Sequence, residues 1–200
     1  MSTAYEESGR TRQKQRTRND LIAAARELIT QGGSAPTVEE AAAAASISRT
    51  TAYRYFRSQR ELLAAAHPVV ELTSLLPPEI GDDPETRLLA AVHAFIESTL
   101  EYEPQQRTML RLSLDASTVP SQLPLRQGRA IAWFEEALAP AEPQLSKAGV
   151  RRLAVAVRSV VGIESLVWLV DVAGLTRDDA AELMLSSARA LVRTTLADRP

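Results

Sequence analysis

The segment TVEEAAAAASISRTTAYRYF, residues 37–56, contains two short helical patterns separated by a four-residue linker. Thr37 and, three residues later, Glu40 form a capping box that opens the first helix. Residues 45–48 form the linker, and the second helix is expected over residues 49–56. Two helices of about two turns each, joined this closely, have the spacing of a helix-turn-helix. This spacing constrains the fold more than any other feature of the chain.

Helical patterns also flank this segment. Ser58 and Glu61 form a second capping box, which opens a further helix near Gln59. Two glycines at residues 32–33 end an earlier helix, whose apolar residues recur at helical spacing: Leu21, Ile22, Ala25, Leu28 and Ile29. The helix-turn-helix is therefore expected to lie within a small helical head.

The remainder of the chain also has helical patterns. Pro68 removes a backbone hydrogen bond from the helix that starts near Gln59, so a kink or break is expected near His67. Prolines and Gly174 separate the later patterns, which cover residues 84–103, 105–117, 124–139, 144–173 and 176–197. Because strand signals are nearly missing, the sequence predicts an all-α fold of about nine helices.

Charge is distributed unevenly over this organisation. We expect a flexible basic arm over residues 1–15, a helix-turn-helix domain over residues 16–63 and a helical body over residues 64–200. Residues 8–60 carry ten Lys or Arg against four acids, a net charge of +6, and since the whole chain carries −2, the remainder carries −8. This asymmetry indicates a polyanionic partner for the head alone. A solvated basic tail over residues 10–18 would explain its share of the charge equally well.

Composition indicates a globular protein of a reducing compartment. The chain has 200 residues, of which 45% are hydrophobic, enough to bury a sizeable core. It contains no cysteine, which excludes disulfides and thiolate zinc sites and favours the cytoplasm. The N-terminus lacks the apolar run of a signal peptide. The most apolar later stretch, residues 150–173, is interrupted by Arg158, Glu164 and Asp171, which argues against a membrane span.

The helix expected over residues 49–56 is suited to present polar groups. On a helical wheel of about 100° per residue, Ala52 and Phe56 form a buried stripe, flanked by Tyr53 and Tyr55 with outward hydroxyls. The opposite side carries Thr50, Thr51 and Arg54. These residue types contact base edges and phosphates. Small alanines let the preceding helix pack closely, so that the second helix can enter a major groove.

A helical hairpin with a solvated polar face is the simpler interpretation of the same segment. It would explain the alanines and the caps. It would not need two edge tyrosines beside four arginines, namely Arg49, Arg54, Arg57 and Arg60. DNA binding is therefore the favoured interpretation.

The segment resembles the tetracycline-repressor (TetR) family of transcriptional regulators. The family pattern T-hydrophobic-x-x-I-A-x-x-A-G-V-S-x-G-T-L-Y-x-Y-F-x-S-K-x-x-L corresponds to TVEEAAAAASISRTTAYRYFRSQREL in this chain. The resemblance is strong over residues 16–63, with specific matches at Tyr53, Tyr55, Phe56, Ser58 and Leu62. Elsewhere the chain is similar mainly in helix count and in the tail over residues 162–180. The family has Ile, Gly, Gly and Lys where this chain has Ala41, Ser46, Thr50 and Gln59.

The resemblance implies roles for individual residues. It implies phosphate contacts by Thr37, Ser48, Thr51 and Tyr55. It implies base contacts by Arg49, Thr50, Tyr53 and Arg54. Gln59 removes the family's lysine contact, for which Arg57 or Arg60 can supply the charge, and residues 10–18 are expected to reach neighbouring phosphates. Ser46 in the turn would cost about 1 kcal/mol if its φ is positive.

The resemblance also implies a body that binds a ligand and dimerises, so that the ligand shifts the separation of two DNA-reading heads. The pattern at about 150–173 is apolar nearly all round, and the pattern at 176–197 carries a stripe of small and apolar residues. Together they predict a homodimer through a four-helix bundle, with an ordinary intrachain core as the alternative. The stripe comprises Ala180, Leu183, Ser187, Ala188, Leu191 and Thr195. Pro68 either forms a hinge between head and body or simply ends a helix.

Ligand-contacting residues are expected on the helices of the body. The candidates are His93, Phe95, Met109, Trp133, Phe134 and Trp168, each of which would equally suit a plain core. Glu164 and Asp171 lie seven residues apart on one apolar face, and acids there need a partner. That partner is an interfacial arginine such as Arg158 or Arg189, or else a lipophilic cation that acts as effector.

Other functions have less support. The sequence shows no phosphate-binding glycine loop, nucleophile elbow or paired-histidine metal motif, and its two histidines, His67 and His93, are far apart. We therefore predict no catalysis, no cofactor and no metal. An architectural DNA-binding protein would share the basic head without needing a large acidic body. The favoured prediction is a repressor that an unidentified small molecule releases from a palindromic operator, with double-stranded DNA as partner and no membrane association.

Overall fold

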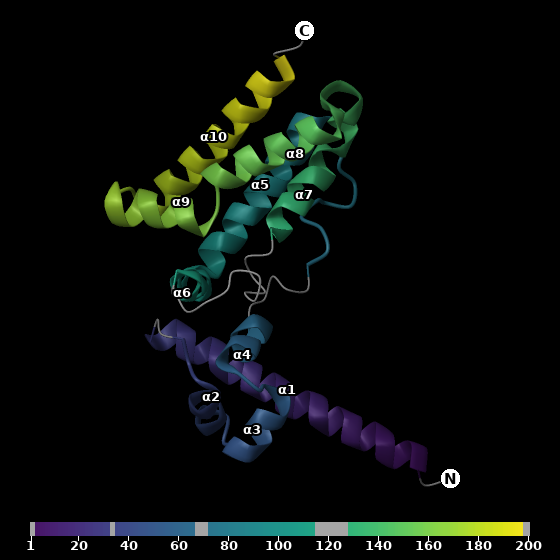
Figure 1. The fold of residues 1–200 in the computed structure, drawn as a ribbon, viewed down its shortest axis with the longest axis vertical. Coiled ribbons are helices and arrows are strands. Elements are labelled where there is room, and N and C mark those ends of the chain that lie inside the picture. Colours follow the sequence, from purple (N-terminus) through teal and green to yellow (C-terminus); the bar gives the residue numbers. More distant parts are fainter. Residues whose placement is uncertain (1–2, 33–34, 67–71, 115–127, 198–200) are drawn as a thin grey trace.

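The computed structural model describes residues 3–32, 35–66, 72–114 and 128–197. These residues form helices and no strand, which confirms the predicted all-α fold. In Figure 1 the N-terminal helices α1 to α4 lie below the remaining helices, and the molecule is elongated. The helices are α1 (Thr3–Gly32), α2 (Val38–Ala44), α3 (Arg49–Tyr55), α4 (Gln59–Ala66), α5 (Pro84–Glu101), α6 (Glu103–Ser113), α7 (Arg129–Leu138), α8 (Glu142–Val160), α9 (Ile163–Val167) and α10 (Arg177–Ala197).

Helices α1 to α4 pack around one small core and form the head. Alanines supply much of this core, and their short side chains let α2 lie close to both α1 and α3. The Arg26 Nε–H donates to the Ala66 carbonyl oxygen at 2.6 Å, which ties α1 to the last turn of α4. All of α4 therefore packs with the head. The core comprises Leu21, Ile22, Ala25, Val38, Ala41, Ala42, Ala52, Phe56, Leu62 and Ala66.

The turn between α2 and α3 has the geometry of a Schellman motif. The Ile47 amide donates to the Ala42 carbonyl at 2.8 Å, and the Ser46 amide donates to the Ala43 carbonyl at 3.1 Å. Ser46 has a φ of 55°, the left-handed conformation that glycine adopts without strain. The condition given for strain at Ser46, a positive φ, is therefore met.

The N-terminal segment differs from the expected flexible arm. Residues 3–15 continue α1 as helix, and this part projects beyond α2 to α4 in Figure 1. Its Arg, Lys and Gln residues are strong helix formers, and the segment is continuous with the helix that packs in the head. The Gln15 amide also donates to the Asn19 side chain at 3.1 Å, one turn further on. Arg12, Lys14 and Arg16 are therefore exposed along a helix.

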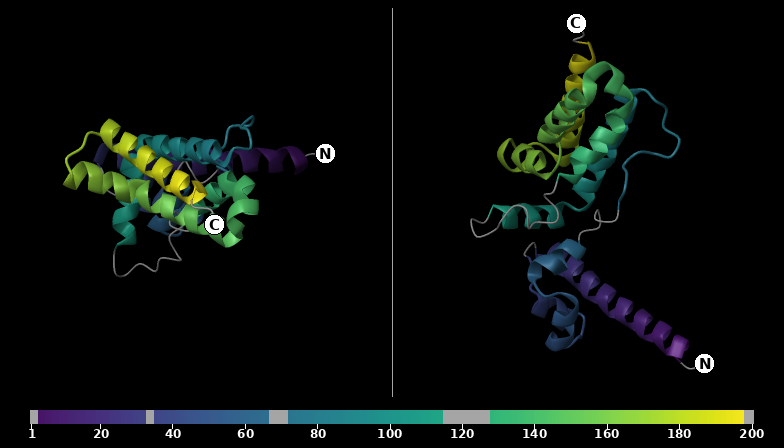
Figure 2. Two further views of the ribbon diagram at one scale, coloured as in Figure 1. Left: turned by 90° about the horizontal axis from the view of Figure 1, so that it is seen from above. Right: turned by 45° about the vertical axis from the view of Figure 1, so that its right-hand side comes forward.

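The body is a bundle of α5, α7, α8 and α10 around a larger core. Figure 2 shows these four helices side by side, with α9 at one end of the bundle. The predicted patterns over residues 84–103 and 176–197 correspond to α5 and α10. One face of α10 is buried in this intrachain core through Ala180, Met184, Ala188 and Val192. Two members of the predicted dimer stripe, Ala180 and Ala188, therefore serve the core of their own chain.

The single helix expected over residues 144–173 is divided in the structure. Helix α8 ends before Val161, which is extended, and Gly162 follows with a φ of 104°. The Arg158 Nη1–H donates to the Val161 carbonyl at 2.7 Å. This carbonyl oxygen therefore has a hydrogen-bond donor although the helix ends there. A Cβ atom on Gly162 would lie 2.9 Å from Arg158 Nη1. Helical periodicity continues through the break and therefore did not reveal it.

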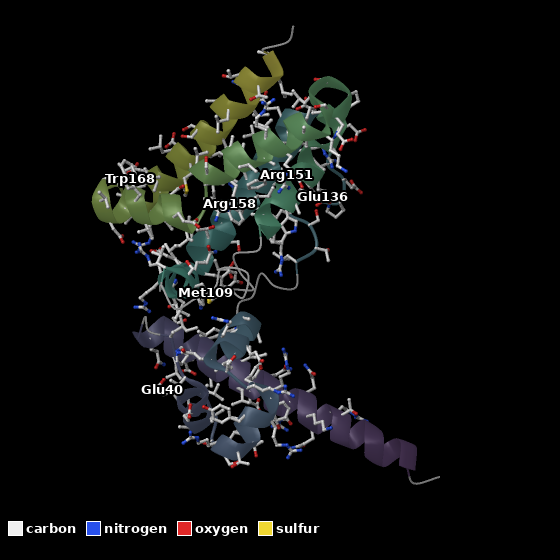
Figure 3. The ribbon with its side chains drawn as sticks, viewed as in Figure 1. Glu40, Met109, Glu136, Arg151, Arg158 and Trp168 are labelled. Atoms are coloured by element: carbon white, nitrogen blue, oxygen red, sulfur yellow. The ribbon has the colours of Figure 1, made fainter. Side chains whose placement is uncertain are left out.

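Helix α6 lies between the head and the bundle (Figure 2). Its Met109 is buried with Ile29 of α1 and Leu63 of α4 in a separate small cluster, and Figure 3 shows Met109 at this junction. The covalent connection between head and body runs through residues 67–71, which lie outside the described residues, as does the candidate hinge Pro68.

One described stretch, within Arg129–Val172, is long and apolar enough to cross a membrane by length and composition. In the structure it is divided among α7, α8 and α9, and its apolar residues contribute to the core of the body. Helices in a protein core pass the same test of length and hydropathy, so the stretch is weak evidence of a span.

Candidate nucleic-acid interface

Helix α3 turns its polar side outward. Ala52 is fully buried and Phe56 is 3% exposed, which confirms the predicted buried stripe. The Arg18 guanidinium of α1 lies 5.5 Å from the centre of the Phe56 ring and covers it. The outward residues include Arg49, Thr50, Tyr53 and Arg54, with Thr51 and Tyr55 partly exposed. Helix α3 therefore has the side-chain arrangement that the sequence predicts for a recognition helix.

Caps fix the starts of α2 and α3. The Thr37 Oγ1 accepts a hydrogen bond from the Glu40 amide at 3.2 Å, and the Thr37 amide donates to the Glu40 carboxylate at 2.7 Å, which confirms the predicted capping box. These bonds from the backbone and side chain of Thr37 lower the pKa of Glu40. The Ser48 Oγ accepts from the Thr51 amide at 3.2 Å and donates to Thr51 Oγ1 at 2.8 Å. Thr37 and Ser48 remain exposed beside α3.

Glu39 of α2 connects two outward residues of α3. Its Oε1 accepts a hydrogen bond from the Tyr53 hydroxyl at 2.7 Å and lies 2.9 Å from Arg49 Nη2. The Arg49 guanidinium also lies 5.7 Å from the centre of the Tyr53 ring. The hydrogen bond from Tyr53 lowers the pKa of the Glu39 carboxyl, and the same bond raises the pKa of the Tyr53 hydroxyl. Two of the four candidate base-reading side chains, Arg49 and Tyr53, therefore contact the same carboxylate.

Sequence reasoning missed Glu39 because its partners lie on the next helix. The available signal was an acid in the first turn of α2, in a head that is otherwise basic. The first turns of α2 and α3 meet only through the tertiary geometry of the helix-turn-helix.

The start of α4 differs in detail from the expected capping box. The Ser58 Oγ accepts from the Glu61 amide at 3.2 Å, but the Glu61 carboxylate accepts from the Arg57 amide at 2.8 Å. Gln59, which replaces the family's lysine, donates from Nε2 to the Ala35 carbonyl at 2.7 Å and joins α4 to the segment before α2. Its side chain therefore has a structural role. Two basic side chains follow at this edge, the exposed Arg57 and the partly exposed Arg60.

The six residues predicted to line a ligand cavity do not lie around one cavity. Phe95 and Phe134 are buried in the body, with their rings edge to face at 5.7 Å between centres. Trp133 is buried with them and donates from Nε1 to the Thr73 carbonyl at 3.1 Å. Met109 belongs to the cluster at the head–body junction. These four residues are core residues, as the alternative to a ligand contact predicted for each of them.

The other two candidates are exposed. His93 of α5 lies 3.4 Å from the Glu97 carboxylate at the surface. Trp168 belongs to a π-helical turn, Trp168–Val172, after α9, and it is 59% exposed (Figure 3). Trp168 lines a groove of about 440 Å³ between α8, α9 and α10, which the other five candidates do not line.

Both acids on the apolar stretch have arginine partners in the same chain. The Glu164 carboxylate accepts from Arg158 Nη2 at 2.8 Å. Asp171 accepts from both terminal nitrogens of Arg107 at 2.6 and 2.8 Å, and these bonds lower the pKa of the Asp171 carboxyl. Arg158 was one of the expected partners, whereas Arg107 comes from α6 and was not expected.

The head has the arrangement of a helix-turn-helix DNA-binding domain. Helix α2 packs on the core through Val38, Ala41 and Ala42, a four-residue turn follows, and α3 presents Arg, Thr and Tyr side chains outward. Residues 21–66 match the family described as "Bacterial regulatory proteins, tetR family". Over these residues the chain resembles the regulatory proteins of this family, and the match supports a DNA-binding transcription regulator.

The fold beyond this domain also has a counterpart among solved structures. The crystal structure of a TetR transcriptional regulator from Rhodococcus sp. RHA1 is similar, with a TM-score of 0.57. The two chains are 18% identical, and the match covers 90% of this chain and 98% of that chain. At this identity the likeness concerns the fold. No curated protein sequence matches the chain.

Proposed function

We propose that this protein is a cytoplasmic repressor that binds a palindromic operator as a homodimer and leaves it when a small molecule binds the body. In this proposal residues 16–63 read DNA and residues 64–200 bind the effector and dimerise. The observation that carries it is α3, whose Ala52 and Phe56 face the core while Arg49 and Thr50 face outward. A recognition helix needs this division between its two sides.

The homodimer is supported by apolar side chains on the outer side of the body. Val155 of α8 and Leu183 of α10 are each 44% exposed, and Trp168 and Val172 are more exposed still. A second copy of the chain that packs on these four large apolar side chains would remove them from water. The opposite face of α10 is already buried in its own core, so the second copy would pack on the outer face.

The effector proposal is supported by the resemblance to the TetR family and by the groove beside Trp168. Its lining combines apolar side chains with the Glu164 carboxylate, which already pairs with Arg158. A screen of small molecules for thermal stabilisation of the purified protein would identify effectors, because a ligand that binds the folded state raises its melting temperature. A stabilising compound that leaves DNA affinity unchanged would not be the effector.

DNA binding is tested with the region upstream of the gene and a scrambled duplex of the same composition. Fluorescence anisotropy over a series of salt concentrations should show tighter binding to the upstream DNA, weakening as salt rises because phosphate contacts release counterions. Arg49→Ala should weaken specific binding by about 1–3 kcal/mol, because an arginine contact to a base edge is lost. Arg193→Ala removes an arginine that pairs with Glu85 in the body and serves as the control.

The same titration distinguishes the alternatives. Equal affinity for upstream and scrambled DNA would favour an architectural DNA-binding protein. Absence of binding at low salt would contradict the DNA-binding function. An Arg49→Ala variant that binds as tightly as the wild type would remove Arg49 from the interface.

A further inference from the structure

On the outward surface of the head, the Glu39 carboxylate lies among the candidate base-reading groups of α3. Glu39 contacts Tyr53 and Arg49 through the same oxygen, Oε1, at 2.7 and 2.9 Å. Its side chain is 37% exposed, so it lies at the surface beside both residues. A carboxylate near phosphates is repelled by them, and a surface that only bound the DNA backbone would not need one.

An ionised carboxylate can only accept hydrogen bonds. In the major groove cytosine offers the N4 amino group and adenine the N6 amino group, whereas guanine and thymine present acceptors. A carboxylate that reaches the base edges therefore favours an amino base and disfavours a keto base. A carboxyl is ionised at neutral pH even at its ordinary pKa of 4.5, and the hydrogen bond from Tyr53 lowers the pKa of Glu39 below that value.

The neighbouring groups suit a guanine–cytosine pair. The major-groove edge of this pair carries two acceptors on guanine and one amino donor on cytosine. Arg49 supplies donors and Glu39 supplies an acceptor side by side, with the two side chains 2.9 Å apart. A carboxylate offers about four acceptor sites, so the two contacts at Oε1 leave capacity for a base.

We propose that Glu39 is a specificity-determining residue, which accepts a hydrogen bond from the amino group of a cytosine or adenine in each half-site while Tyr53 and Arg49 hold it in place. This inference rests on the proposed DNA-binding function. It assigns a base-reading role to α2 in addition to α3, and it gives the carboxylate a function in rejecting wrong sequences.

The test is a selection of bound duplexes from a pool with a randomised central region, using the full-length wild type and three variants. Glu39→Gln should reduce the preference for an amino base by about tenfold at one position of each half-site, with the other positions unchanged. Tyr53→Phe keeps the carboxylate but removes one of its two holding contacts, so it should weaken that preference by less than Glu39→Gln does. Glu97→Gln removes one exposed acid from α5 of the body and should match the wild type. Anisotropy on duplexes that differ at that position measures the same ratio.

Three outcomes would overturn the inference. A Glu39→Gln profile identical to that of the wild type would remove Glu39 from base reading. A uniform change in affinity for all sequences would limit Glu39 to electrostatic repulsion. A Tyr53→Phe variant that loses the preference as fully as Glu39→Gln would mean that Glu39 acts only by positioning Tyr53. A wild-type chain that enriches no sequence would contradict the proposed function together with this inference, whereas the first three outcomes contradict the inference alone.

Discussion

Ser46 occupies a turn position where its side chain is a disadvantage. It lies one residue beyond the C-cap of α2, with a φ of 55°, and its neighbours complete a Schellman motif that requires this conformation. A left-handed backbone brings Cβ close to the following carbonyl oxygen, which costs roughly 1–2 kcal/mol. Glycine avoids this strain but loses more entropy on folding.

Ser46→Gly should therefore raise the free energy of unfolding by up to about 1 kcal/mol, after the entropy of the unfolded glycine is subtracted. Urea unfolding followed by circular dichroism measures the change. Ser46→Ala keeps the Cβ atom and should bring no such gain. Equal stabilisation by alanine would show that the strain of the turn is not the cause.

At the scale of elements, a cluster of charges joins α6 to the end of the body. Glu103 at the start of α6 is buried, and its side chain accepts from Arg107 Nε at 2.6 Å and from Arg177 Nε at 2.7 Å. Arg107 in turn binds Asp171. Burial raises the pKa of Glu103, but hydrogen bonds from Arg177 and Arg107 outweigh it and leave the pKa below its ordinary value of 4.5. Helix α6 is thereby connected to both α10 and the π-helical turn.

Because the pKa of Glu103 is lowered on folding, its ion pairs contribute stability that is present above pH 4.5 and lost as the pH falls through the folded value. Glu103→Gln should lower the free energy of unfolding by about 2 kcal/mol at neutral pH, since three charge-assisted hydrogen bonds, one from Arg107 and two from Arg177, weaken. Its stability should also fall less steeply than that of the wild type between about pH 5 and pH 3. Denaturant unfolding across this range is the measurement. Parallel pH profiles for the two proteins would contradict the assignment.

At the scale of the whole molecule, the proposed function depends on a second copy. Two heads must meet half-sites about 34–36 Å apart, or a multiple of this distance, and a single copy presents one head. The exposed apolar residues of α8, α10 and the π-helical turn are the proposed contact. The junction at Met109 is where a movement of the body would reach the head directly, because α6 there packs on both α1 and α4.

If the chain dimerises as proposed, Leu183→Arg should convert the proposed dimer to a monomer, because the interface would bury an unpaired charge. Sedimentation velocity measures the change in mass. Affinity for a two-half-site duplex should fall, while affinity for a single half-site stays the same because the head is intact. Glu182→Arg places the same charge on the adjacent exposed position and is the control. A Leu183→Arg variant that remains dimeric would place the interface elsewhere.

Much of the head could be predicted because its signals are local. The capping box at Thr37, the cap at Ser48 and the turn at Ser46 each involve residues within five positions of one another. The buried stripe of Ala52 and Phe56 follows from helical periodicity alone. The same reasoning predicted helices in the body but not the break at Gly162. There the apolar pattern continues while the backbone leaves the helical conformation.

The sequence by itself determined the helical content, the helix-turn-helix and the outward side of α3, because caps and periodicity act over a few residues. The tertiary structure alone decided that Glu39 meets Arg49 and Tyr53 and that Asp171 pairs with Arg107. It also decided that most of the predicted pocket residues became core and that Trp168 stayed outside. These outcomes depend on how separate helices approach each other, and the burial of each side chain is a property of the packed helices together.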